Sequence, residues 1–165
     1  MRTITVNLYT FDELSGKAKE KALQELHSTA EYPWHDENHQ ALNAIEKAFK
    51  LERFNWEYSE HTHHCSLTVP HDLKQGFNRA KIDLYLKYLE KDNPFICGYY
   101  LMEFFKVGLW KSFNQHGDIR EALHDAIGSV VKTCQEDMEC YFSEESLAEH
   151  AMANETEFTE DGSLA

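Results

Sequence analysis

The sequence predicts an α+β fold, in which an N-terminal strand, a central hairpin and a C-terminal strand form a small antiparallel sheet packed by five to six helices. Apolar and polar residues alternate in three short segments, at residues 2–9, 53–69 and 156–159, and this period of two predicts strands. The segments between them repeat their apolar residues every three or four positions, which predicts helices. The chain has 165 residues, of which 42% are hydrophobic and 27% charged, so we expect one globular domain over residues 1–165.

The strands are expected to bring the two ends of the chain together. Near the N-terminus, Ile4, Val6 and Leu8 alternate with polar residues and form the inward side of the first strand. Phe158 lies in the Thr-Glu-Phe-Thr segment near the C-terminus, and an Asp-Gly turn follows it. Because both segments have the same alternation, we expect them to pair with each other and to share one sheet with the hairpin.

Six helices are predicted from the spacing of the apolar residues and from the residues at the helix ends. Their ranges are 11–28, 33–51, 72–91, 94–113, 117–141 and 143–153. Thr10 and Glu13 have the spacing of a capping box at the start of the first helix, and Ser15 offers it a second start. The fourth helix is apolar on nearly all sides, so we expect it at the centre of the fold. The side chains expected to pack there are Ile96, Tyr100, Phe104 and Leu109, against Trp56, Leu123 and Ile127.

The net charge of −13 is concentrated near the C-terminus. Residues 1–132 contain 16 basic and 19 acidic residues, whereas residues 133–165 contain ten acidic residues and no Lys or Arg. Proteins that bind nucleic acid or an anionic membrane directly need an excess of Lys and Arg, so the composition argues against both kinds of binding. The partner that this charge favours is a protein with a basic surface.

The sequence predicts a soluble, cytoplasmic protein. Its most apolar stretch, residues 95–110, is shorter than the roughly 20 apolar residues that a membrane span needs, and it contains Glu103 and Lys106. The first residues lack the pattern of a signal peptide. The cysteines are too far apart for a Cys-x-x-Cys pair, so we expect reduced thiols. The four cysteines are Cys65, Cys97, Cys134 and Cys140.

A set of acidic residues on the last two predicted helices is the candidate partner-binding surface. Its members are Glu136, Asp137, Glu139, Glu144, Glu145 and Glu149. Helix residues three or four positions apart lie about 5–6 Å from each other, which is close to the separation of phosphates along a nucleic-acid strand. The set therefore predicts a surface that imitates nucleic acid. The simpler interpretation is that these charges only keep an exposed helix soluble.

Histidines form the second candidate site, since the chain contains 10 of them. His35 and His39 share one face of a helix, and their HDENH run is similar to a zincin motif with Asp36 in place of the catalytic Glu. The alternative metal-binding set is His35, His39, His61, His63 and Cys65, of which the last three project to one side of an extended strand. This spacing matches no closed zinc pattern, so we expect a solvated hairpin tip, a small buried Cys65, no metal and no cofactor.

No catalytic motif is found in the sequence. The chain has no G-x-S-x-G elbow, no Walker loop and no G-x-G-x-x-G turn, and its 7 glycines are too dispersed to build a phosphate-binding loop. A Cys-His pair is possible in any chain with this many histidines, but no spacing indicates one. We therefore expect a protein that is not an enzyme and has no catalytic residues.

Two segments at the ends of the chain resemble a single family. The opening TITVNLYTFDELSGKAKEKALQEL, residues 3–26, resembles the start of a family of small proteins encoded by bacteriophages and prophages, in which a strand precedes L-Y-T-F-D-E-L-S and a charged helix. The ending ANETEFTEDGSLA, residues 153–165, is similar to the end of that family, where E-F-T-E-D-G follows a helix. The resemblance implies a phage protein in an infected bacterial cell, and it implies no catalytic residues.

The phage context and the acidic charge together predict an interaction protein. Small phage proteins that are dispensable for building virions often bind host nucleases and other defence machinery, so the resemblance implies an inhibitor of the anti-CRISPR or anti-restriction type. The basic nucleic-acid channels of such host complexes suit an acidic protein that imitates DNA. Two alternatives stay open, namely a metal-dependent enzyme that uses the His/Cys cluster and a regulator of phage replication without a defence target.

Overall fold

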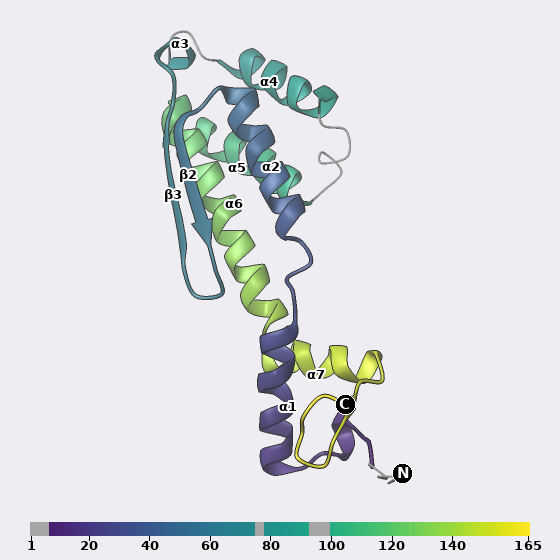
Figure 1. The fold of residues 1–165 in the computed structure, drawn as a ribbon. Helices are drawn as coiled ribbons and strands as arrows, with labels where there is room; N and C mark the ends of the chain where they lie inside the picture. Colours follow the sequence, from purple (N-terminus) through teal and green to yellow (C-terminus); the bar gives the residue numbers. More distant parts are fainter. Residues whose placement is uncertain (1–6, 75–77, 93–99) are drawn as a thin grey trace. The chain divides into compact units, whose positions relative to one another are not determined.

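The computed structural model describes residues 7–74, 78–92 and 100–165, and the fold of these residues is α+β, as the sequence predicts (Figure 1). The described residues form seven α-helices, one 3-10 helix and two antiparallel two-stranded sheets. The chain divides into two compact units. We call Met1–Tyr32 with Met138–Ala165 the terminal unit, and Pro33–Asp137 the central unit.

The terminal unit pairs the two ends of the chain, as predicted. Strand β1 (Tyr9–Thr10) runs antiparallel to β4 (Glu157–Phe158), with Tyr9 opposite Phe158. Of the residues expected to pair on the N-terminal side, Leu8 precedes the strand and is 43% exposed. Ile4 and Val6 lie outside the described residues.

Helices cover these strands and complete a small core in the terminal unit. They are the 3-10 helix η1 (Phe11–Glu13), α1 (Gly16–Thr29) and α7 (Glu144–Ala153). The buried residues of this core are Phe11, Leu14, Ala22, Ala151 and Phe158. The rings of Phe11 and Phe158 meet edge to face with their centroids 6.2 Å apart, an arrangement that aromatic pairs favour.

The helix expected over residues 11–28 is divided in two. The capping box forms, since the backbone N–H of Thr10 donates to Oε2 of Glu13 at 2.8 Å, but it begins the short η1 rather than the long helix. Leu14 then takes extended backbone angles and buries its side chain in the core, where it is 5% exposed. Ser15 is the N-cap of α1, in agreement with the second start that the sequence offers.

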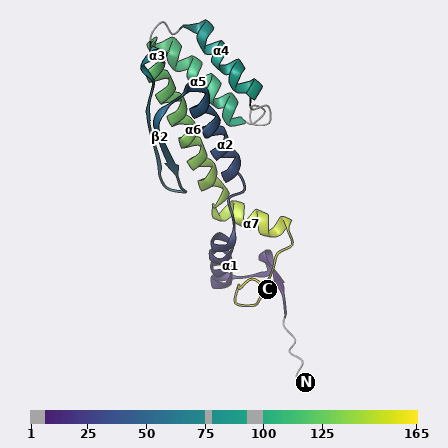
Figure 2. The ribbon, with the colours of Figure 1, turned by 45° about the horizontal axis from the view of Figure 1, so that its top comes forward.

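The central unit packs a hairpin against helices. The hairpin consists of β2 (Glu52–Tyr58) and β3 (His63–Thr68), as predicted. The helices are α2 (His35–Phe49), α3 (His71–Lys74), α4 (Arg79–Asp92), α5 (Tyr100–His116) and α6 (Ile119–Tyr141), the last of which ends in the terminal unit. Figures 1 and 2 both show the hairpin beside α2 and α6.

The terminal strands and the hairpin form two sheets and not the one sheet expected. Among the described residues, each strand of the hairpin pairs only with the other, and β1 pairs with β4 over two residues. The second edge of β4 is occupied as well, because Phe158 forms an antiparallel bridge with Leu164 in the tail that follows. The terminal sheet therefore offers the hairpin no edge along β4.

Helix α5 buries Leu109 as expected, but it does not bury the other described residues that were expected in the core. Leu101, Phe105 and Leu109 follow one another at a spacing of four and are fully buried. Phe104 is 50% exposed and Tyr100 is 43% exposed, so the prediction that they lie in the core is wrong, while Ile96 lies outside the described residues. A helix turns by about 100° per residue, so burial of Phe105 leaves its neighbour Phe104 toward solvent.

The long α6 supplies the buried stripe that its sequence predicts. Its fully or almost fully buried residues include Ala122, Leu123, Ala126, Ile127, Val130, Val131 and Cys134. The helix expected over residues 72–91 appears as α3 and α4, and residues 75–77 between them lie outside the described part of the chain. The core of the central unit is thus formed by α2, α4, α5 and α6 together with one face of the hairpin.

Candidate functional site

Three of the six acidic residues expected to bind a partner lie on α7. Glu144, Glu145 and Glu149 all have exposed side chains. Ser143 caps the helix, because its Oγ accepts a hydrogen bond from the backbone N–H of Ser146 at 3.3 Å. Glu144 and Glu145 lie in the first turn, where negative charge interacts favourably with the helix dipole, so they stabilise α7 as well as give it charge.

The other three acidic residues lie near the end of α6 and differ in their surroundings. Glu136 is exposed, and its carboxylate lies 3.0 Å from the ammonium of Lys132, one turn earlier. Asp137 is only partly exposed, and burial raises the pKa of its carboxyl group. Glu139 is exposed and belongs to the terminal unit, together with the three glutamates of α7. The six residues are therefore divided, with Glu136 and Asp137 in the central unit.

Most of the net charge belongs to the terminal unit. This unit contains thirteen acidic and four basic residues, a net charge of −9, although it has fewer residues than the central unit. The central unit contains sixteen acidic and twelve basic residues, a net charge of −4. Twelve of the thirteen acidic side chains of the terminal unit are exposed, Glu25 being the exception. The terminal unit thus presents carboxylates to solvent at high density.

A lysine on α1 offsets part of this charge, which the sequence pattern did not indicate. Nζ of Lys21 lies 2.6 Å from Oδ2 of Asp161 and donates a hydrogen bond of 2.6 Å to Oγ of Ser163. The hydrogen bond that Lys21 donates to Asp161, together with one from the Thr159 hydroxyl, holds the pKa of the Asp161 carboxyl group well below its usual range. Lys19 lies over the ring of Phe11, with its Nζ 5.3 Å from the centroid.

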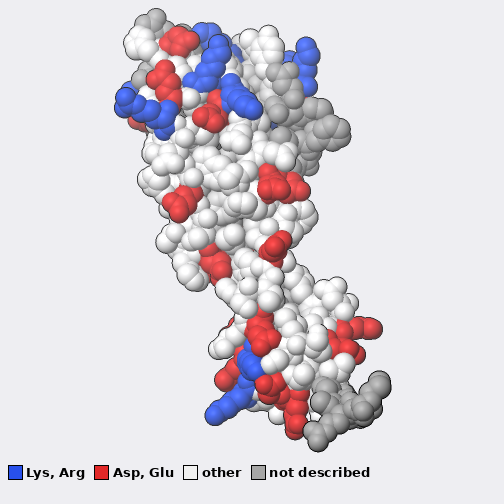
Figure 3. Space-filling view, viewed as in Figure 1, with Lys and Arg blue, Asp and Glu red and all other residues white. Residues whose placement is uncertain are grey.

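The distribution of charge differs along the described surface (Figure 3). On the face shown in Figure 3, most of the Lys and Arg side chains of the central unit gather at the end that carries α3 and α4. Acidic side chains predominate on the same face of the terminal unit. An acidic partner would therefore be attracted to the α3 and α4 end of the central unit, and a basic partner to the terminal unit.

The histidines of α2 pack against aromatic residues of the hairpin. The rings of His35 and His39 have centroids 4.3 Å apart, and the ring of His39 meets that of Trp56 at 4.4 Å. The hydroxyl of Tyr58 lies 3.4 Å from Nδ1 of His35 and accepts a hydrogen bond of 3.2 Å from the side-chain amide of Asn38. Burial, and then the neighbouring His35, lower the pKa of His39, while burial raises the pKa of Tyr58 to about 12. These contacts pack α2 against strand β2 of the hairpin.

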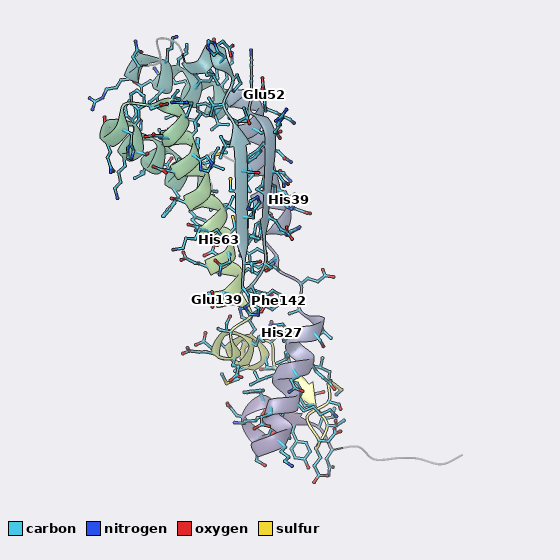
Figure 4. All side chains as sticks on the ribbon, turned by 90° about the vertical axis from the view of Figure 1, so that its left-hand side faces the viewer. His27, His39, Glu52, His63, Glu139 and Phe142 are labelled. Carbon is cyan, nitrogen blue, oxygen red and sulfur yellow. The ribbon has the colours of Figure 1, made fainter. Side chains whose placement is uncertain are left out.

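The remaining members of the alternative metal set have other neighbours. Nδ1 of His63 lies 3.0 Å from the side-chain oxygen of Gln135 on α6, and His61 is exposed at the hairpin turn. Cys65 is half-buried opposite Trp56, and burial raises the pKa of its thiol to about 11, which keeps it neutral near pH 7. Figure 4 shows His39 and His63 on the two separate elements α2 and β3.

The described residues hold no group of three or more His, Cys, Asp or Glu side chains placed to bind one metal ion. The structure brings His35 and His39 together, but it does not join them with His61, His63 and Cys65 into a ligand set. A further histidine, His27 on α1, contacts the ring of Phe142 with centroids 5.1 Å apart (Figure 4). The side chains of His27, His35, His39 and His63 thus contact other elements of their own unit, whereas His61 is exposed.

Comparisons with protein-family models, with curated proteins and with solved structures give no match to this chain. Among the described residues, none of the helices combines the length and the apolar character that crossing a membrane requires. The candidate site is therefore defined by its own geometry and charge, namely the exposed carboxylates of α7 and of Glu139, which all belong to the terminal unit.

Proposed function

We propose that the protein is a non-enzymatic interaction protein that binds a host protein through the acidic surface of its terminal unit and blocks a basic nucleic-acid-binding channel. The observation that carries this proposal is the net charge of −9 in the terminal unit, with nearly all of its carboxylates exposed. Charge of one sign at this density steers association with a surface of the opposite sign. The resemblance of the two chain ends to small phage proteins supports a bacterial defence complex as the target.

The six acidic residues contribute unequally in this proposal. Glu144, Glu145 and Glu149 are exposed, and none of them forms an ion pair within 4 Å with another described residue, whereas Glu136 has Lys132 beside it. Asp137 is partly buried, so its carboxylate is less accessible to a partner than an exposed carboxylate. We therefore expect the carboxylates of the terminal unit to supply most of the attraction, and Glu136 and Asp137 to supply less.

An affinity capture experiment tests this function. The full chain and the triple variant Glu144→Lys, Glu145→Lys, Glu149→Lys are immobilised in separate columns, and lysate of a bacterial host is passed over both. We expect the wild-type column to retain nucleic-acid-binding proteins and the variant column not to retain them. An excess of double-stranded DNA should release these proteins from the wild-type column. Binding should also weaken with added salt, since charges are screened over about 8–10 Å at physiological ionic strength.

A matched variant provides the control for the charge reversal. Lys replaces three exposed acidic residues at the N-terminal end of the same unit, in Asp12→Lys, Glu20→Lys and Glu31→Lys, so that the total charge changes equally. The proposal requires that this control retains more of the captured protein than the α7 variant does. Equal retention by wild type and α7 variant, or no release by DNA, would refute the proposed function.

A further inference from the structure

A pocket of about 690 Å³ lies in the central unit, and its described lining residues come from α2, α3 and α4 and from Lys50, which follows α2. Its volume is within the range of about 300–1,000 Å³ that is typical of small-molecule sites. Neither the acidic residues of the candidate site nor the histidine cluster contributes to its lining. The pocket is therefore a separate feature of the molecule.

Small side chains on one wall and large ones on the other create the hollow. Ala44 and Ala48 lie one turn apart on α2 and face the pocket, so this wall is set back. On α4, Leu84 and Tyr88 lie one turn apart at the pocket and are 49% and 54% exposed. The ring of Tyr85 stacks on the buried ring of Phe49, with centroids 5.2 Å apart and an angle of 15° between the rings. This stacking fixes one apolar wall before any ligand binds.

The edge of the pocket is basic, in a chain whose net charge is −13. Lys47, Lys50 and Lys81 contribute to its lining, and Asp72 is the one acidic residue among the described lining residues. Lys47 and Lys50 are exposed near the end of α2, and neither forms an ion pair within 4 Å with the described residues. Their ammonium groups are thus free to pair with an anion that enters from solvent.

We propose that this pocket binds an amphipathic organic anion, with an aliphatic or aromatic body and a single carboxylate at one end. The body would lie against Leu84 and Tyr88, which expose apolar surface to water, and beside Tyr85. The carboxylate would accept hydrogen bonds from the ammonium groups of Lys47 and Lys50. This inference does not depend on the proposed function, because it concerns another surface and another class of ligand.

The first experiment compares two probes that differ only in the head group. Dodecanoate and dodecan-1-ol are titrated into the full-length protein at low salt, below the concentration at which either aggregates, and heat of binding is measured. We expect dodecanoate to bind with one molecule per chain and dodecan-1-ol to bind at least about tenfold more weakly, because charge-assisted hydrogen bonds contribute about 1.5–3 kcal/mol, and about 1.4 kcal/mol equals a factor of ten in affinity. No binding of dodecanoate, or equal binding of the alcohol, would overturn the proposal.

The second experiment locates the site with variants. The double variant Lys47→Glu, Lys50→Glu is expected to weaken dodecanoate binding at least tenfold. The control is Lys87→Glu, Lys111→Glu, which changes the total charge equally at exposed positions of the same unit that do not line the pocket, and it should bind within a factor of about two of wild type. Equal weakening by both double variants would show that only overall charge matters and would overturn the site.

The apolar part of the proposal has its own pair of variants. Ala48→Phe fills the hollow from α2, and Tyr88→Ala removes an exposed ring from the opposite wall. Both are expected to weaken dodecanoate binding at least tenfold, and circular dichroism and urea unfolding establish that each variant is folded. Because Tyr88 is half-exposed, its variant should keep the fold even if Ala48→Phe does not. Unchanged affinity in the folded Tyr88→Ala protein would contradict the proposed position of the ligand.

Discussion

The ammonium group of Lys21 on α1 lies 2.6 Å from the carboxylate of Asp161, although 140 positions separate the two residues in the chain. A second contact joins the same segments, since the backbone N–H of Leu164 donates to Oε2 of Glu25 at 2.7 Å. Helix α1 therefore holds the C-terminal tail through two side chains, in addition to the pairing of β1 with β4.

Asp161 should make the stability of the protein depend on acidity below pH 4. Because its pKa in the folded protein is lowered from 3.8, its contribution to stability is present at pH values above 3.8 and is lost as the pH falls through the folded pKa. Asp161→Asn should therefore be less stable than wild type at pH 7, and the difference should shrink below pH 3.8. Urea unfolding across this range measures both. The control Glu160→Gln, at an exposed neighbouring position, should differ little from wild type at any pH.

Two adjacent phenylalanines of α5 should respond differently to truncation. Phe105 is fully buried, so Phe105→Ala should lower the free energy of unfolding by about 3–5 kcal/mol through lost burial and the cavity left behind. Phe104 is 50% exposed, and Phe104→Ala should cost less than about 1 kcal/mol. Urea unfolding of the two variants provides the comparison. Similar losses of unfolding free energy in the two variants would contradict the burial of Phe105 and the exposure of Phe104.

Replacement by alanine should change the stability of the protein in opposite directions at two of the glycines. Gly162 has φ +87°, and an added Cβ would collide with the backbone carbonyl of Ala18 on α1, so Gly162→Ala should destabilise the protein by at least about 1 kcal/mol. Gly128 lies in α6 with nothing within 4 Å of an added Cβ, so Gly128→Ala should stabilise the protein by about 0.5–1 kcal/mol. Thermal unfolding distinguishes the signs. Stabilisation by Gly162→Ala would mean that the tail does not approach α1 as described.

The described cysteines should differ in their reaction with iodoacetamide. The thiolate is the reactive form, and burial raises the pKa to about 11 at Cys65 and about 12 at Cys134. Cys140 is exposed. At pH 8 we therefore expect alkylation of Cys140 first, followed by mass spectrometry of the peptides, and similar rates at all three sites in concentrated urea. Alkylation of native Cys65 as fast as Cys140 would instead support an activated thiol in the histidine cluster.

Features that depend on local sequence were predicted well. The hairpin follows from alternation on both sides of a turn, and α7 follows from Ser143 with acidic residues in the first turn. The buried stripe of α6 follows from its helical spacing, which is regular from Ala122 to Cys134. The pairing of the chain ends was also expected, although the paired residues on β1 were shifted to Tyr9 and Thr10.

Features that depend on distant segments were not predictable in this way. Helix α5 has apolar residues around most of its circumference, so its sequence does not distinguish the buried Phe105 from the exposed Phe104. The same limit applies to the candidate site. The exposure of Glu144, Glu145 and Glu149 follows from their sequence, but the partial burial of Asp137 depends on the surrounding fold. The pocket could not be predicted from the sequence, because it forms only where α2 and α4 lie side by side.

The pairing of β1 with β4 has a consequence for synthesis. Tyr9 and Thr10 are synthesised long before Phe158, and at about 5–20 residues per second the delay is roughly 7–30 s. During this time Phe11 lacks the ring against which it packs, so the terminal core waits for the late part of the chain. A product of translation that stops before Phe158 cannot complete this core. The acidic surface therefore acquires its folded support only in chains whose synthesis has passed that residue.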